Sequence, residues 1–165
     1  MTHDGVCAVG GASAVPIRVE RMEVRRGHLV CQVAFGNAPR VTSPQLMSRV
    51  LAEVPTLARH ACVNERGTTF AAVMGCTPLP HLLEHLVVDL QVRAEAGQWL
   101  TLPGVAAEAP PSVVTVTHDH PIVGTSEWLD EAAGIARIDV SFADDLVALR
   151  AMRDSVAFLN KLLRG

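Results

Sequence analysis

The chain has 165 residues, of which 49% are hydrophobic, 19% are charged and only 4% are aromatic, with no tyrosine. This length is enough to bury a hydrophobic core without disulfides, so the simplest prediction is one domain. The net charge of -3 and the pI near 6.1 lack the basic excess that binds nucleic acid or an anionic membrane, so neither is an expected partner.

The first third of the chain predicts a β-hairpin followed by a helix. Residues 1–14 are rich in Gly and Ala and are expected to form a flexible lead without the features of a signal peptide. Two β-rich runs over residues 15–25 and 28–35 are joined at Arg26-Gly27, which is typical of a hairpin. The Ser-Pro pair that begins residues 43–54 predicts a short helix.

The middle of the chain contains its clearest helix. Residues 55–64 are ambiguous and include a candidate strand, residues 67–69 are expected to be a loop, and residues 70–74 a helical turn. Thr77 can cap a helix that runs to about residue 94, because the two prolines of its first turn remove no helical hydrogen bond.

The last part of the chain predicts loops, strands and a closing helix. Loops are expected over residues 96–111 and 118–134, and strands over residues 113–117 and 135–142. Apolar residues at three- and four-residue steps predict a helix over residues 143–163. Both tryptophans fall in the predicted loops. They either flank a binding cleft or, as we favour, clamp a loop to the core.

This order of elements favours an α+β fold. Hairpins with few β-α-β crossovers predict a two-layer sandwich, with a mainly antiparallel or mixed sheet and helices packed on one face. Residues 15–165 would form its single domain. Four scattered cysteines without C-x-x-C spacing predict reduced thiols and a cytoplasmic protein. No apolar stretch approaches the roughly 20 residues that cross a bilayer, and the oligomeric state is not indicated.

One face of the central helix carries concentrated chemistry. His81, Glu84 and His85 share an arc of about 100°. Two imidazoles four residues apart can bind one Zn²⁺, and the carboxylate beside them can activate water. The order H-x-x-E-H is the inverted zinc-protease signature. Val88 and Val92 continue this stripe, which predicts that the histidines lie in a cleft.

Other interpretations of this face stay open. The histidines can equally be half-exposed helix residues, with Glu84 on a solvated surface. Asp89 follows His85 by four residues and could accept a hydrogen bond from a ligating imidazole, although an exposed Asp is the commoner case.

Two stretches of the chain resemble the amino-terminal domain of cyanophycin synthetase, the enzyme that polymerises aspartate and arginine. The family's P-S-L-x-x-H-x-C stretch is similar to P-T-L-A-R-H-A-C at residues 55–62. Its G-T-x-x-G-H-V-I-E-H-V-A-L-E-L-Q helix is similar to C-T-P-L-P-H-L-L-E-H-L-V-V-D-L-Q at residues 76–91. With a looser likeness over residues 137–163, the resemblance covers about residues 55–163. The family's ATP-binding and ligase domains would not fit in 165 residues, so polymer synthesis by this chain alone is not expected.

The resemblance implies roles for individual residues. In some members of the family this domain looks like a metallopeptidase that cuts the polymer into primers, and in others it holds the polymer. By position, His81 and His85 would ligate zinc and Glu84 would be the general base. Pro80 replaces a family glycine beside the first histidine, and Asp89 replaces a glutamate in the position predicted to orient a ligand.

The third metal ligand is the least determined part of this site. His60 is the first choice because it lies in the other matched stretch; a hydrogen-bonded histidine near the core is the equal alternative. His118, His120, Glu127 and Glu131 are runners-up on a predicted loop that could cover the site, or they are simply solvated.

The leading hypothesis is a zinc-dependent hydrolase of a peptide or isopeptide bond, with a peptide-like substrate such as a cyanophycin-like polymer. A non-catalytic polymer- or peptide-binding or assembly module that kept the fold is the alternative. A metal-binding protein without hydrolysis is the third possibility.

Overall fold

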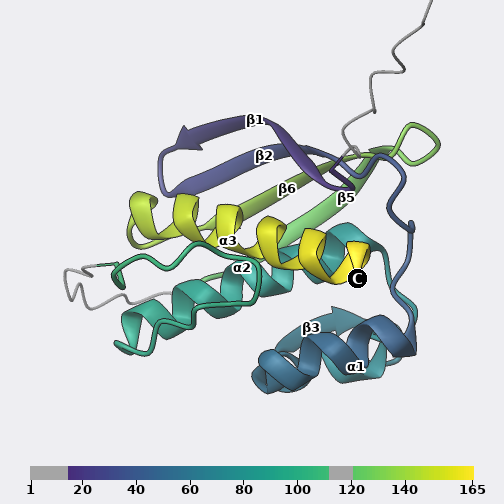
Figure 1. Ribbon diagram of the computed structural model, residues 1–165, viewed down its shortest axis with the longest axis horizontal. Helices are drawn as coiled ribbons and strands as arrows, with labels where there is room; N and C mark the ends of the chain where they lie inside the picture. Colours follow the sequence, from purple (N-terminus) through teal and green to yellow (C-terminus); the bar gives the residue numbers. More distant parts are fainter. Residues whose placement is uncertain (1–14, 112–120) are drawn as a thin grey trace, which may run out of the picture.

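The computed structural model describes residues 15–111 and 121–165, which form an antiparallel sheet, two long helices on one face of it, and a smaller layer beyond them (Figure 1). The strands are β1 (Arg18–Arg25), β2 (His28–Ala34), β3 (Ala61–Asn64), β4 (Gly67–Thr69), β5 (Gly124–Asp130) and β6 (Ile135–Ser141). The helices are α1 (Pro44–Glu53), α2 (Leu79–Glu95) and α3 (Asp145–Arg164), with short 3-10 helices η1 (Pro55–Arg59) and η2 (Phe70–Ala72). The main sheet has the order β1-β2-β6-β5, and each neighbouring pair is antiparallel. The predicted α+β class is thereby confirmed.

The sheet buries one face because its central strands alternate. Leu29, Cys31 and Val33 of β2 are fully buried, and so are Ala136, Ile138 and Val140 of β6. Side chains two residues apart lie on the same face of a strand, so this alternation places one apolar row of each strand against the helices. The predicted hairpin between β1 and β2 turns at Gly27, whose φ of 75° favours glycine.

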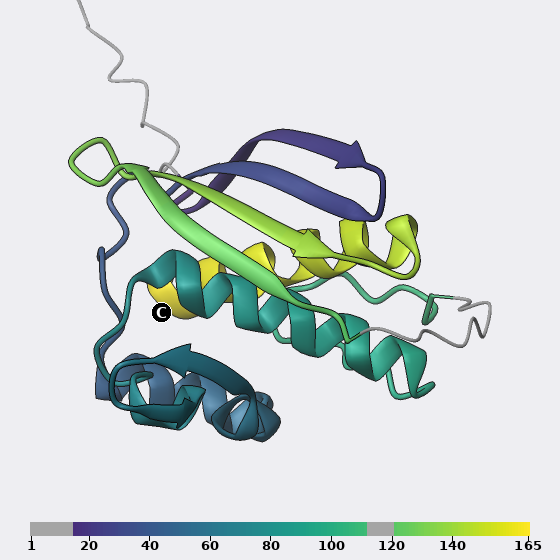
Figure 2. The same ribbon diagram turned by 180° about the vertical axis from the view of Figure 1, so that it is seen from behind.

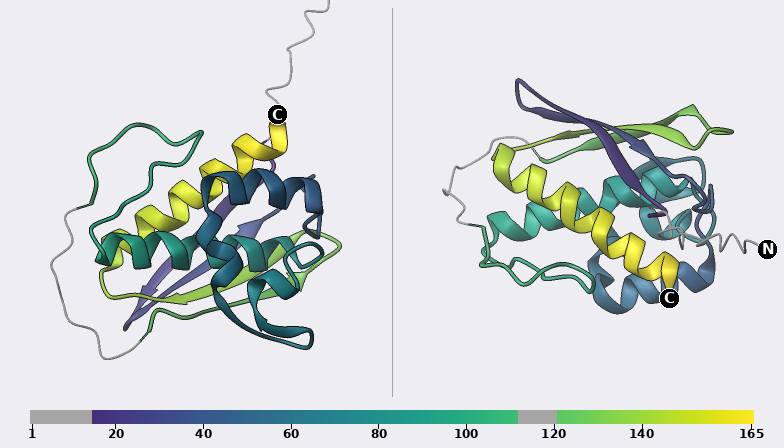
Figure 3. Two further views of the ribbon diagram at one scale, coloured as in Figure 1. Left: turned by 90° about the horizontal axis from the view of Figure 1, so that it is seen from below. Right: turned by 45° about the horizontal axis from the view of Figure 1, so that its top comes forward.

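The helices α2 and α3 lie side by side on one face of the sheet (Figure 3). α2 packs beneath β5 and β6, and α3 beneath β1 and β2. The β3–β4 hairpin, α1 and the 3-10 helices form the smaller layer on the other side of α2 (Figure 1). α2 is therefore covered on two sides, which explains why it is buried over most of its surface.

Two of the three α-helices begin at a side-chain N-cap, of which Ser43 belongs to the Ser-Pro pair that predicted α1. Ser43 accepts a hydrogen bond from the Leu46 amide at the start of α1, and Asp144 caps α3. The prediction for α2 was wrong, because Pro78 occupies its N-cap position and Thr77 makes no capping bond. The Thr77 hydroxyl bonds to the side chain of His81 instead.

The predicted loop over residues 118–134 contains β5, which corrects the expectation that Trp128 lies in a loop. Trp128 packs edge-on against Phe35, with ring centroids 5.3 Å apart, and the Arg40 guanidinium lies over its ring. The predicted loop over residues 67–69 is likewise the strand β4. The predicted lead over residues 1–14 and the whole predicted strand over residues 113–117 lie outside the described residues.

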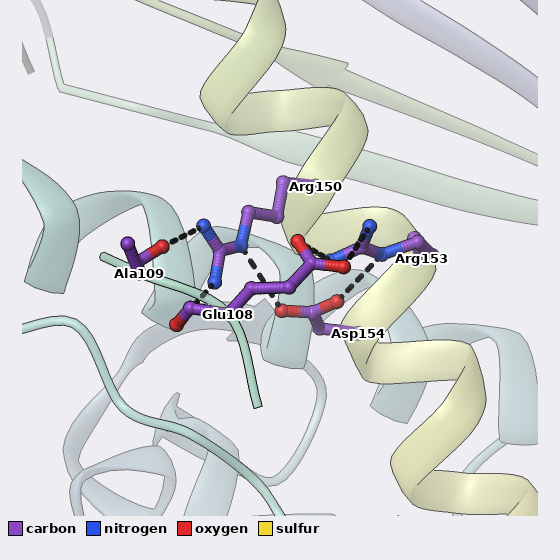
Figure 4. Close-up of polar contacts among 5 residues, drawn as sticks. All are labelled: Glu108, Ala109, Arg150, Arg153 and Asp154. Carbon is purple, nitrogen blue, oxygen red and sulfur yellow. Dashed lines mark hydrogen bonds and ion pairs between the residues drawn. The ribbon is translucent and has the colours of Figure 1, made fainter. Parts of the chain in front are cut away.

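The connection between α2 and β5 is held against α3 by charged side chains (Figure 4). Arg150 lies over the Trp99 ring, 4.9 Å from its centroid, and donates to the Ala109 carbonyl. Arg153 makes two hydrogen bonds to the carboxylate of Glu108, at 3.0 and 3.1 Å. Trp99 thus clamps its loop to the core, as favoured from the sequence. Across residues 15–111 and 121–165, no helix is both long and apolar enough to cross a membrane.

Candidate metal centre

A cleft of about 1100 Å³ is lined by residues of the β3–β4 hairpin, of β5 and of one face of α2. Figure 2 shows the arrangement of these elements. His81, Glu84 and His85 line it from α2, and Val88 and Val92 continue the same face. His85 and Glu84 are almost fully buried, at 6% and 7% exposure. The predicted position of the histidines in a cleft is confirmed.

Three donor atoms converge at one place in this cleft. The Cys62 Sγ atom lies 3.4 Å from His81 Nε2, and His81 Nε2 lies 3.1 Å from His85 Nε2. One donor atom from each of the three residues lies within 4.8 Å of the others. Cys62 comes from β3 and the histidines from α2, so the site joins the two sides of the cleft. This group could hold a metal ion.

The second nitrogen of each histidine has a partner that leaves Nε2 free to bind a metal. Thr77 Oγ1 lies 2.8 Å from His81 Nδ1, and His60 Nδ1 lies 3.2 Å from His85 Nδ1. If each ligating ring carries its proton on Nδ1, both Nε2 atoms present a lone pair towards Cys62. Partners of this kind fix the tautomer and the orientation of a ligating imidazole.

Asp89 orients this arrangement through His60. Its Oδ1 atom accepts from His60 Nε2 at 3.0 Å and from the Thr56 hydroxyl at 2.6 Å, and its Oδ2 accepts from Arg93 Nε at 2.6 Å. Burial raises the pKa of Asp89, but the hydrogen bonds from His60, Thr56 and Arg93 outweigh burial and hold the pKa below its ordinary value. Asp89 thus contacts His60 rather than a histidine of α2. His60 as the third ligand stays a prediction, and Cys62 is the residue beside both Nε2 atoms.

Burial keeps the paired histidines neutral, which is the state that binds a metal. Burial, with the neighbouring His81 and His60, lowers the pKa of His85 to about 3, and burial lowers the pKa of His81. Phe70 covers both rings, with its centroid 4.2 Å from that of His85 and 5.3 Å from that of His81.

Glu84 projects from the same helix face towards β5. Its Oε2 atom accepts a hydrogen bond from the Ser126 hydroxyl at 2.7 Å. Burial raises the pKa of Glu84, and the bond from Ser126 only partly opposes this rise. Gly124 makes this packing possible, because a Cβ atom there would lie 2.7 Å from Glu84 Cγ. No cation pairs with Glu84 in the described part of the chain.

The remaining candidates are less close to the three donor atoms. Glu127 lines the cleft from β5 but is exposed. Glu131 is also exposed, and its backbone carbonyl accepts from Arg40. His118 and His120 lie outside the described residues. Sequence reasoning missed Cys62 as a candidate ligand, although the H-x-C pattern of residues 60–62 was the signal that could have identified it.

A comparison with protein families agrees with the resemblance drawn from the two sequence stretches. Residues 29–101 match the family described as the cyanophycin synthase-like N-terminal domain. This range holds the three donor residues and Glu84, and it begins and ends earlier than the predicted residues 55–163. Comparisons with curated proteins and with solved structures give no significant match.

Proposed function

We propose that this chain, which resembles the cyanophycin synthase-like N-terminal domain over residues 29–101, is a zinc-dependent hydrolase of a peptide or isopeptide bond. The observation that carries the proposal is the convergence of Cys62, His81 and His85 at 4.8 Å or less in the cleft that the buried Glu84 also lines. A catalytic zinc site typically combines three protein ligands with one open position. The cleft provides room for that position.

Two of the three donor separations suit a tetrahedral zinc site. At ordinary zinc–ligand distances, two nitrogens lie about 3.3 Å apart, and a nitrogen and a sulfur lie about 3.6 Å apart. The observed separations are 3.1 Å between the two Nε2 atoms and 3.4 Å between Cys62 Sγ and His81 Nε2. Cys62, His81 and His85 would hold the ion, and His60 and Thr77 would orient the rings.

Glu84 is the proposed general base. A zinc ion supplies Lewis acidity, which lowers the pKa of water and polarises a carbonyl group. Glu84 then takes a proton from water and passes it to the leaving amine. A raised carboxylate pKa suits a group that must both accept and return a proton, and the Ser126 hydroxyl holds the carboxylate at the cleft wall.

The resemblance, the cysteine ligand and the net charge support a substrate class, a cellular location and a set of partners. A peptide-like chain, such as the aspartate–arginine polymer that the resemblance suggests, is the proposed substrate. A cysteine ligand must be reduced to bind zinc, which supports a cytoplasmic location. The acidic net charge supports the absence of nucleic acid and membranes among the partners.

A non-catalytic binding module is the second candidate, and the apolar lining of the cleft favours it. In that case His81→Ala should leave peptide binding intact. A metal site without hydrolysis is the third, and it predicts bound zinc with no position open to an added ligand such as azide.

The test of the hydrolase compares Glu84→Gln with wild type, both loaded with zinc, on aspartate–arginine polymer and on unstructured peptides. Glu84→Gln should keep its zinc and lose at least about 100-fold of the turnover, because general-base catalysis contributes roughly that much. Glu127→Gln, which removes an exposed carboxylate from the same cleft, should keep its turnover. Unimpaired turnover by Glu84→Gln would overturn the proposed mechanism.

A further inference from the structure

The strand β5 has one edge that pairs with no strand in residues 15–111 and 121–165. It is the last strand in the sheet order, next to β6. The Ser141 amide donates to the Val123 carbonyl at 2.8 Å, which makes these opposed residues a hydrogen-bonded pair. In an antiparallel pair, hydrogen-bonded and non-bonded positions alternate. The N–H and C=O groups of Gly124 and Ser126 therefore point away from β6.

This free edge borders the candidate metal centre. The cleft is lined by β5 and the residues before it over 121–128, and by the β3–β4 hairpin on the opposite side. At about 3.3 Å per residue, this length matches roughly eight residues of extended peptide. The residues whose backbone groups point away from β6 include Ser126, and the side chain of Ser126 donates a hydrogen bond to Glu84. A peptide backbone paired with this edge would thus pass the proposed general base.

The side chains of the cleft offer apolar contacts and disfavour an acidic peptide. Its described lining includes the acidic residues Glu84 and Glu127 but no Lys or Arg. Val63, Val92 and Val123 in the lining are exposed, at 106%, 48% and 54%. Apolar surface open to solvent gains from contact with apolar side chains, whereas an aspartate side chain would meet two carboxylates and no Lys or Arg side chain of the described lining.

We propose that the cleft binds an extended peptide with apolar side chains and no carboxylates, which adds a fifth strand to the sheet along the free edge of β5. This inference rests on the proposed function for its metal-dependent cleavage. Backbone pairing would give affinity, and the valines would select apolar side chains.

The test measures binding to zinc-loaded Glu84→Gln protein, so that cleavage does not consume the probe. The probe is a capped, fluorescein-labelled octapeptide in which valine and serine alternate, which fixes the face of the strand that each type of side chain occupies. Two further versions carry N-methyl groups on either the even-numbered or the odd-numbered residues. N-methylation removes a backbone donor, so only the version methylated along the edge that faces β5 should bind at least about tenfold more weakly. The affinity of the other methylated version should stay within about twofold of that of the unmethylated peptide.

A second arm tests the exclusion of acidic side chains on zinc-free wild-type protein, in which Glu84 and Glu127 both keep their carboxylates and no metal ion can bind aspartate. The same octapeptide with aspartate in place of serine should bind at least about tenfold more weakly than the parent peptide. Val92→Lys should recover part of this loss, because it places a cation on the cleft wall. Leu146→Lys, at a 71% exposed position on α3, is the matched control and should recover none.

The outcomes separate this inference from the proposed hydrolase. Absent binding, equal loss from both methylated versions, or equal binding of the aspartate peptide would overturn the inference. Zinc-dependent turnover by wild type alongside such a result would leave the hydrolase standing. A loss confined to one methylated version, without turnover of any peptide by wild type, would support strand addition and count against the hydrolase.

Discussion

His60 and Cys62 lie on either side of one residue in the chain, yet they contact different parts of the histidine pair. Cys62 Sγ approaches His81 Nε2, the nitrogen that faces His85, whereas His60 approaches His85 at Nδ1, the opposite nitrogen of that ring. Cys62 lies in β3, whereas His60 precedes that strand as the C-cap residue of η1, so the two side chains do not follow one regular strand. The structure therefore suggests a ligand role for Cys62 and an orienting role for His60.

Cys62→Ala and His60→Ala should weaken zinc binding to different extents. Cys62→Ala removes a donor and should abolish stoichiometric zinc, whereas His60→Ala should keep zinc with an affinity about 10- to 100-fold lower. Competition against a zinc-binding dye measures both affinities. Loss of zinc from His60→Ala together with full retention by Cys62→Ala would restore His60 as the third ligand.

Asp89→Asn should destabilise the fold by about 3 kcal/mol at neutral pH, because it leaves Arg93 without its buried partner. The pKa of Asp89 is lower in the folded state than its ordinary value. Its contribution is therefore complete above about pH 4, the ordinary Asp value, and is lost as the pH falls through the lower folded value.

Urea unfolding of wild type and Asp89→Asn at pH 7 and at pH 2 checks both parts of this prediction. The difference in free energy of unfolding between the two proteins should shrink at the acidic pH. A difference that stays constant would contradict the assigned role of the ionised carboxylate.

At the scale of elements, the approach of β5 to α2 depends on a missing side chain. Gly124 allows this approach, because a Cβ atom at its position would lie only 2.7 Å from Glu84 Cγ. Glu84 is nearly buried in this position, and Ser126 from the same strand fixes its carboxylate. The proposed base is thus positioned by a strand that is distant in the sequence.

Gly124→Ala should lower both stability and turnover. The added methyl group must displace Glu84 or β5, which should cost about 1–3 kcal/mol in the free energy of unfolding and move the carboxylate from its position. Gly75→Ala is the matched control, since a Cβ atom there meets nothing within 4 Å. Chemical denaturation and turnover measured on the same samples provide the test. Equal behaviour of the two variants would show that the close approach does not matter.

Within the charged cluster on α3, the buried residue Asp154 should contribute most to the free energy of unfolding. Asp154 is 1% exposed and lies between Arg150 and Arg153, with Nε–carboxylate distances of 3.5 and 2.9 Å (Figure 4). Asp154→Ala leaves Arg150 uncompensated in a largely buried place and should cost about 3 kcal/mol. Glu108→Ala breaks only an exposed pair and should leave stability unchanged within error. Thermal unfolding distinguishes them, and a larger loss from Glu108→Ala would contradict this ranking.

At the scale of the whole molecule, local patterns predicted the elements whose apolar faces are set by neighbours in the sequence. The alternation at Ile138 and Val140 predicted β6, and the stripe through Met152 and Leu159 predicted α3. β5 was missed because its polar side chains give no apolar alternation, and its pairing with β6 decides its conformation. Propensity is weak against such long-range pairing.

The same distinction holds for the site. His81, Glu84 and His85 could be found from spacing on one helix, because a helix fixes which side chains share a face. The position of Cys62 depends on how β3 packs across α2, and that of Ser126 on how β5 closes over Glu84. Neither is encoded in a local pattern.

The most direct test of the metal centre is the zinc content of protein purified without a metal-affinity tag, for wild type beside His81→Ala. The account predicts about one zinc per wild-type chain and almost none in the variant, because the lost imidazole is a ligand that faces both other donors. Circular dichroism of both proteins would show that the variant is folded. Wild type without zinc after zinc has been supplied, or equal zinc in both proteins, would contradict the account.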